Sequence, residues 1–244
     1  MINRRTLLQR AAVLTAAVPF SSLAGAAQGA PEKLDDLSIV RRALALHPGL
    51  YRYQTPAGFE RRFARFAEEW RGKADRASRF LALSRLTAAV RCGHTQCNPF
   101  NQSEAVVAEL FDRPTRVPFR FHWIGEAMVV TGDSGAATGI ARGSVIERLN
   151  GQAPAALLRA LLPYTRADGG NDAKRVVQLE MRGDEEFETF DILQGLLFPP
   201  GPDGHAVAWR DPAGHRHRAV LPAVPDVARK ALAPLTPDDG PLWD

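Results

Sequence analysis

The residues best suited to chemistry lie within one stretch of the chain, Val90 to Ser103. It contains both cysteines, Cys92 and Cys97, and one of the six histidines, His94. Two cysteines that lie close together in an oxidising compartment usually pair, so their spacing predicts a disulfide. Two alternatives stay open. One is a metal site, for which the two thiols and the imidazole supply three of the four ligands that structural zinc requires, and the other is two free thiols.

His94 is the candidate acid–base group. Histidine titrates near neutral pH, but acid–base catalysis also needs a nucleophile and an orienting partner within hydrogen-bond reach. The sequence contains no Gly-x-Ser-x-Gly, Ser-x-x-Lys or His-Glu-x-x-His motif that would identify a nucleophile or a zinc centre. A local hydrogen bond near a helix end explains the same histidine without catalysis.

Residues 1–30 form a predicted export signal. A basic start with Arg4 and Arg5, a short apolar run and a small-residue end are the three parts of a cleaved secretory signal. The arginine pair resembles the twin-arginine motif. The apolar run is shorter than the roughly 20 residues that span a bilayer. We therefore expect a periplasmic or secreted bacterial protein with no stable membrane anchor after the signal is removed.

The composition is that of an ordinary globular chain, with 244 residues of which 45% are hydrophobic and 24% charged. The net charge is +4, and three of these positive charges lie in residues 1–30, which contain no acid. The remainder is nearly neutral and has no basic run with interleaved aromatic residues. We therefore expect no nucleic-acid partner.

The first half of the remaining chain has helical periodicity. Asp35–Asp36 and Thr55 are typical helix starts, and a third helix is expected to begin near Asp75. Gly93 is expected to end this third helix as a left-handed cap. Aromatic residues at spacings of 4, 3 and 4 predict one buried helix face, made of Phe59, Phe63, Phe66 and Trp70. The sequence thus predicts a helical bundle over residues 31–115.

From Val117 the period changes from 3.6 to 2, which predicts a β-rich domain over residues 116–224. Strands are expected at 118–123, 127–131, 143–151, 205–210 and 216–220. Asn150-Gly151 predicts a turn. Residues 164–200 have the pattern of a partly helical insertion, and the proline-rich residues 225–244 that of a linker. The predicted fold class is α+β.

Two further polar groups have candidate roles. Lys174 and Arg175 could bind an anion, although a capped helix start explains the segment 168–175 equally well. The three histidines of the last two strands are expected to lie on the surface, and they are His205, His215 and His217.

The order of these parts resembles the N-terminal half of a serine peptidase family, the S41 family of tail-specific (C-terminal processing) and tricorn-like proteases. The helical part ends in Cys92-Gly-His-Thr95, where that family has an Asp-Gly-His-Thr-like signature. A Gly-x-x-Ile-x-x-Ile-Asn-Gly motif of the family's PDZ-like domain is matched by Gly143, Ile146, Leu149, Asn150 and Gly151. The resemblance covers residues 34–244. It departs from the family at Cys92, which replaces the acidic residue, and at the additional Cys97.

The resemblance implies that peptide or unfolded-protein C-termini are the partners, and that no cofactor and no metal are needed. In the tricorn-like branch the histidine of the signature is the catalytic base, so the resemblance assigns this role to His94. A PDZ-like domain captures a peptide C-terminus as an added strand. This implies a peptide site beside the flexible loop 132–143, formed by Gly143, Ser144, Val145 and Ile146.

The family's nucleophilic serine and its lysine or glutamate partners lie in a catalytic core after the PDZ-like domain, and we find no counterpart before Asp244. The expected function is therefore that of the N-terminal portion of such a peptidase, truncated and not catalytic alone. Two alternatives stay open. One is a stand-alone module that binds peptide tails, and the other is a metal or redox protein built on Cys92, His94 and Cys97.

Overall fold

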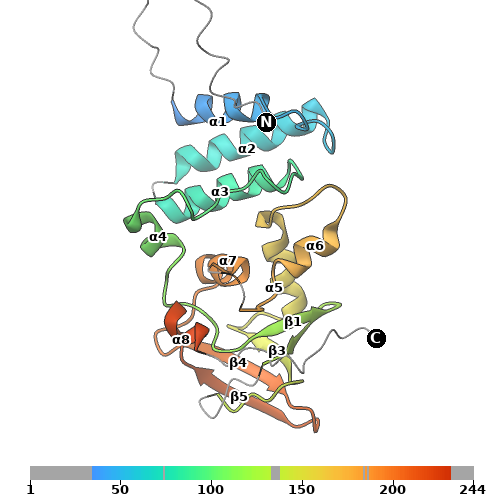
Figure 1. The fold of residues 1–244 in the computed structure, drawn as a ribbon, viewed down its shortest axis with the longest axis vertical. Helices are drawn as coiled ribbons and strands as arrows, with labels where there is room; N and C mark the ends of the chain where they lie inside the picture. The colour runs from blue at the N-terminus through green and yellow to red at the C-terminus, as the bar shows by residue number, and fades with distance from the viewer. Residues whose placement is uncertain (1–34, 74, 133–137, 184, 186, 232–244) are drawn as a thin grey trace, which may run out of the picture.

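The computed structural model describes residues 35–73, 75–132, 138–183, 185 and 187–231. The predicted export signal, residues 133–137 of the predicted flexible loop and residues 232–244 of the predicted linker lie outside the described residues. Within them, a helical layer and a β-sheet lie at opposite ends of the molecule, with shorter helices between (Figure 1).

The helical layer contains three helices that lie side by side (Figure 1), and they are α1 (Asp36–Ala45), α2 (Pro56–Gly72) and α3 (Arg76–Ala88). Each begins where the sequence predicts, because a side chain satisfies a backbone N–H of the first turn. The acceptors are Asp35, Thr55 and Asp75. The aromatic stripe of α2 faces the core as predicted, with Phe66 only 2% exposed.

The end of α3 differs from the prediction. The residue with left-handed backbone is Arg91 (φ +58°), and Gly93 does not adopt a positive φ. A side chain other than glycine is strained there and needs compensating contacts. Arg91 has them, because its Nε donates to the Gly169 carbonyl (2.6 Å) and its guanidinium pairs with Asp172 (2.7 Å).

One antiparallel sheet contains five strands in sequential order, and they are β1 (Phe121–Ile124), β2 (Ala127–Val130), β3 (Val145–Leu149), β4 (His205–Arg210) and β5 (Arg216–Leu221). The α+β class is confirmed. The predicted turn after β3 is also present, since Asn150 (φ +49°) and Gly151 (φ +79°) both have left-handed backbone.

Helices α5 (Pro154–Leu161) and α7 (Thr189–Leu197) supply apolar side chains to the core of the sheet. Phe190 of α7 is fully buried, and its ring lies 4.8 Å from that of Phe121 on β1. The segment predicted as an insertion therefore contributes to the main core. Three short elements complete this middle layer, namely α4 (Glu104–Leu110), η1 (Leu162–Tyr164) and α6 (Asp172–Val177).

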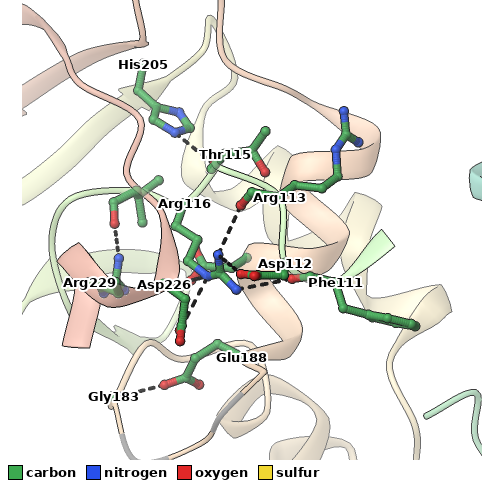
Figure 2. A network of polar contacts seen from close by, with 12 residues as sticks. Phe111, Asp112, Arg113, Thr115, Arg116, Gly183, Glu188, His205, Asp226 and Arg229 are labelled. Carbon is green, nitrogen blue, oxygen red and sulfur yellow. Dashed lines mark hydrogen bonds and ion pairs between the residues drawn. The ribbon is translucent and has the colours of Figure 1, made fainter. Parts of the chain in front are cut away.

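The segment predicted as a linker begins with a helix, α8 (Asp226–Lys230). Arg229 of this helix is 3% exposed and donates a hydrogen bond to the Val117 carbonyl. Arg116 forms an ion pair with Asp226 at 3.8 Å (Figure 2). This part of the chain is therefore held against the body by buried charges, which a proline-rich composition does not reveal.

His205 is buried, which corrects the prediction that it lies on the surface. Its Nδ1 lies 3.1 Å from the Asn150 side-chain nitrogen. Its Nε2 lies 3.1 Å from the Thr115 carbonyl oxygen (Figure 2). Burial lowers the pKa of His205, and the hydrogen bonds to the backbone of Thr115 and Arg116 oppose this only in part. The ring therefore links the turn after β3 to the segment that enters the sheet.

This burial predicts acid sensitivity. The folded-state pKa of His205 is lower than its unfolded value of about 6.5, so its contribution to stability is present above that pH and is lost as the pH falls. We expect the free energy of unfolding, measured with urea, to fall between pH 7.5 and 5.5, and to fall less in His205→Gln. The exposed control His215→Gln should retain the full decline. An unchanged decline in His205→Gln would contradict this prediction.

A second prediction concerns the turn between α7 and β4. Gly204 has φ +121°, and a Cβ there would overlap the Leu221 carbonyl oxygen. We expect Gly204→Ala to lower the free energy of unfolding by about 2–4 kcal/mol, from strain and overlap together. At Gly201 an added Cβ would lie 3.7 Å from the nearest atom. Gly201→Ala should therefore change stability by less than about 1 kcal/mol, and equal losses in both variants would count against this account.

Candidate functional site

The chain that leaves α3 forms a tight turn around one sulfur atom. The Thr95 N–H donates to the Cys92 carbonyl at 3.1 Å. The Cys92 thiol is hydrogen-bonded by the backbone N–H of His94 and by the side chains of His47, Thr95 and His94. The end of α1 and the end of α3 therefore place two imidazoles and a hydroxyl around a half-buried cysteine.

The ring of His47 has a defined orientation. Its Nδ1 accepts a hydrogen bond from the Gly49 N–H at 3.0 Å. A neutral imidazole with an acceptor at Nδ1 carries its proton on Nε2. The nitrogen that remains to interact with Cys92 is therefore a donor, which suits a thiolate. Sequence reasoning missed His47, because it lies 45 residues before the cysteine and belongs to no motif.

Hydrogen bonds that favour the thiolate lower the pKa of Cys92 to about 6, and the largest contribution comes from the backbone N–H of His94. Burial opposes this shift. A thiolate is the nucleophilic form of cysteine, so we expect Cys92 to react at neutral pH.

Cys97 lies in a different environment, and the predicted disulfide is not formed, since both cysteines are free. Burial raises the pKa of Cys97, although hydrogen bonds with the Ser84 and Thr87 side chains act the other way. It lines a cavity of about 110 Å³ on the α3 side of the turn, together with Phe80 and Phe111. The pairing prediction is wrong because the two thiols have different partners, which their spacing could not reveal.

His94 is exposed and lies near a carboxylate. A Cβ on Gly93, the residue before His94, would lie 3.6 Å from the Asp168 Cγ. The pKa of Asp168 is lowered mainly by its hydrogen bond with Lys174 at 2.9 Å, and to a smaller extent by His94. The structure thus places the turn that carries the predicted histidine beside a carboxylate that the sequence placed in a separate cluster.

Lys174 and Arg175 have carboxylate partners within their own segment. Arg175 pairs with Asp172 at 3.3 Å, and Asn171 caps α6 by accepting the Lys174 N–H at 3.1 Å. The capped helix start, one of the two interpretations of this segment, is therefore present.

The predicted peptide site over Gly143, Ser144, Val145 and Ile146 has no free strand edge. Val145 pairs with Val129 of β2 on one side and with Arg210 of β4 on the other. The Gly143 N–H donates to the Val130 carbonyl at 2.8 Å and the Ser144 N–H to the Ala141 carbonyl at 3.1 Å. A peptide cannot be added as a strand at β3, because neighbouring strands already occupy both of its edges.

The other exposed histidines share one carboxylate. His215 and His217 are both exposed, as predicted, and their rings lie 3.3 and 2.8 Å from the Asp211 carboxylate. The hydrogen bond with His217 makes the largest contribution to a lowering of the Asp211 pKa to about 2. Among the described residues no group of three or more His, Cys, Asp and Glu side chains could hold a metal ion.

No helix of the described part of the chain is both long and apolar enough to cross a membrane.

Comparisons with known proteins find little that is similar. No protein-family model and no curated protein matches the chain. Among solved structures, the chain is similar to the crystal structure of mature CPAF, with a TM-score of 0.43 and 10% sequence identity. The match covers 66% of this chain and 27% of that one, so the chain spans about a quarter of the length of mature CPAF.

The two thiols should differ in their reaction with iodoacetamide. We expect alkylation of Cys92 to follow its thiolate and reach half its maximal rate near pH 6, because its pKa is lowered to about 6. Cys97 should react slowly across this range, because burial raises its pKa. Both thiols lie on the tryptic peptide that begins after Arg91, so tandem mass spectrometry after timed labelling assigns the label to each cysteine and measures both rates.

The control for this experiment is a substitution of the donor. His47→Ala should shift the half-maximal pH of Cys92 upward, and the matched variant His122→Ala, on β1, should leave it unchanged. A half-maximal pH near 9 for the unmodified Cys92 would contradict the assigned hydrogen bonds.

Proposed function

We propose that this chain is the N-terminal, peptide-binding portion of an exported serine-type peptidase of the S41 family, tail-specific or tricorn-like, in which His94 serves as the general base. The observation that carries the proposal is that His94 is exposed on a turn whose neighbouring residue, Gly93, lies against the carboxylate of Asp168. A nucleophile–base–acid arrangement would need this carboxylate to orient the imidazole and a hydroxyl to reach it.

In this proposal the hydroxyl is supplied from outside the described residues. The position of the imidazole fits this role, because it lies on an exposed turn that connects the helical layer to the rest of the molecule. A second segment can therefore approach without displacing core side chains. Export to the periplasm is part of the proposal and is supported by the pattern of residues 1–30.

Peptide recognition is proposed at β5, in place of β3. Strand β5 is at the edge of the sheet, and no strand of the described residues pairs with its outer side. The opposite edge is partly covered, since Phe121 of β1 exchanges backbone hydrogen bonds with Met181 (3.0 and 3.3 Å). A hollow of about 700 Å³ next to β5 includes Val220, which is 58% exposed. An extended peptide can add to such an edge and place side chains in such a hollow.

The surroundings of Cys92 support a second candidate function. A thiol flanked by two imidazoles is the nucleophile–base pair of cysteine-dependent acyl transfer. In that reaction the thiolate would attack a carbonyl carbon, and an imidazolium would return the proton to the leaving group. The same assay separates the two candidates, because a fluorophosphonate blocks a catalytic serine and iodoacetamide blocks Cys92.

The test of the proposed function uses the full chain with an unfolded substrate such as reduced casein, and with a short apolar peptide in its acid and amide forms. We expect saturable binding of the peptide and no turnover by this chain alone. Hydrogen exchange should show protection of residues 216–221 on binding and no change at residues 143–146.

Each other outcome has a defined meaning. Turnover that a fluorophosphonate abolishes would contradict the expectation that this chain alone supplies no nucleophilic serine. Turnover that only iodoacetamide abolishes would favour the cysteine candidate. Absence of binding to any peptide would refute the peptide-binding role. Equal affinity for the acid and amide forms would mean that strand addition alone, without carboxylate capture, provides recognition.

A further inference from the structure

A pocket on the far side of Arg91 from the Cys92 turn has a concentration of positive charge. Its volume is about 410 Å³. Five arginines and one tyrosine supply its polar lining, and they are Arg62, Arg65, Arg85, Arg91, Arg175 and Tyr53. The arginines come from α2, α3, the turn that follows α3, and α6. The fold therefore brings together cations that lie more than 100 positions apart in the sequence.

The arginines form a deep and an outer group. The side chains of Arg85, Arg91 and Arg175 are 23%, 25% and 16% exposed. Arg65, on α2, is 66% exposed, and Arg62 of the same helix is also exposed. Guanidinium groups thus extend from the interior of the pocket to its rim, where a ligand enters.

Four of these five cations share two carboxylates. Glu69 pairs with both Arg65 and Arg85, and Asp172 pairs with both Arg91 and Arg175. Neither carboxylate belongs to the lining of the pocket. The positive charge is therefore only partly neutralised, and the repulsion between the arginines favours a bound anion.

Arg62 and Arg175 contribute hydrogen-bond donors as well as positive charge. Arg62 makes its hydrogen bond to the neutral side chain of Gln54, at 3.3 Å. The Nε of Arg175 is buried and has no hydrogen-bond partner among the described residues. A buried donor without an acceptor is unfavourable, so an anionic oxygen that reaches it would be stabilised.

The remaining walls are apolar. Phe66 and Leu86 belong to the core of the helical layer, and Pro163 closes the opposite side. A ligand that fills this pocket therefore has anionic oxygens for the arginines and a carbon skeleton for the walls. The planar fork of a guanidinium matches both carboxylate and phosphate oxygens.

We propose that this pocket binds a small organic anion with two or more negatively charged groups, either carboxylates or phosphates. The inference does not depend on the proposed peptidase role, because it involves neither His94 nor the edge of β5.

The test is isothermal titration calorimetry on the full chain at constant ionic strength, with citrate and pyrophosphate as the two probes and acetate as the monovalent comparison. We expect saturable binding of at least one polyvalent probe, with an affinity at least tenfold higher than for acetate. Binding of citrate alone identifies a carboxylate ligand, and binding of pyrophosphate alone identifies a phosphate ligand.

Matched double variants on α2 locate the site. Arg62→Gln with Arg65→Gln should weaken binding at least tenfold. Arg61→Gln with Arg71→Gln removes the same charge from exposed positions of the same helix outside the pocket lining, and should change affinity less than twofold. Thermal unfolding of each variant confirms that it is folded. Equal weakening by both pairs, or no saturable binding of either polyvalent probe, would overturn the proposal.

Discussion

The arrangement of the molecule depends on one buried cation, the guanidinium of Arg116. Its side chain is 5% exposed and lies in the segment that leads from α4 into the sheet. It donates to the carbonyls of Phe111 (3.2 Å) and Arg113 (3.0 Å). A charge in this position is stable only if partners surround it, so the segment must adopt a conformation that brings its own carbonyls to the guanidinium.

Carboxylates from distant parts of the chain complete this environment. Asp226 of α8 lies 3.8 Å from Arg116, and Asp191 of α7 lies 3.9 Å away. Burial raises the pKa of Asp191, and the charges of Arg229 and Arg116 oppose the rise. Loss of one partner from a buried pair costs ~3–5 kcal/mol, because the other charge is left without compensation. The network therefore fixes α7 and α8 relative to the segment between the helical layer and the sheet.

The sequence predicts those features that neighbouring residues determine. Caps at Asp35, Thr55 and Asp75 need only a side chain and an N–H three residues later, and the Asn150-Gly151 turn needs only two residues with left-handed backbone. The buried stripe of α2 follows from periodicity alone. In each case the interacting groups lie within a few positions, so composition and spacing contain the information.

Contacts between distant segments explain where the predictions differ from the structure. His205 is buried because Thr115 and Asn150 supply its partners, at separations of 90 and 55 positions. The cysteines stay apart because His47 approaches one of them, and Ser84 and Thr87 approach the other. Addition of a peptide strand at β3, the predicted mode of binding, is excluded because β2 and β4 cover both edges of this strand. For the candidate site, the sequence therefore indicated His94 and Cys92 and could not indicate Asp168 or His47.

Arg91 connects the two regions that carry the proposals. It has a left-handed backbone that few residues other than glycine adopt, and its bonds to Gly169 and Asp172 hold it there. Its backbone begins the turn that surrounds the Cys92 thiol, while its guanidinium enters the arginine-lined pocket. An anion in that pocket would compete with Asp172 for this guanidinium. One residue therefore contributes its backbone to the turn that contains the thiol and its side chain to the pocket.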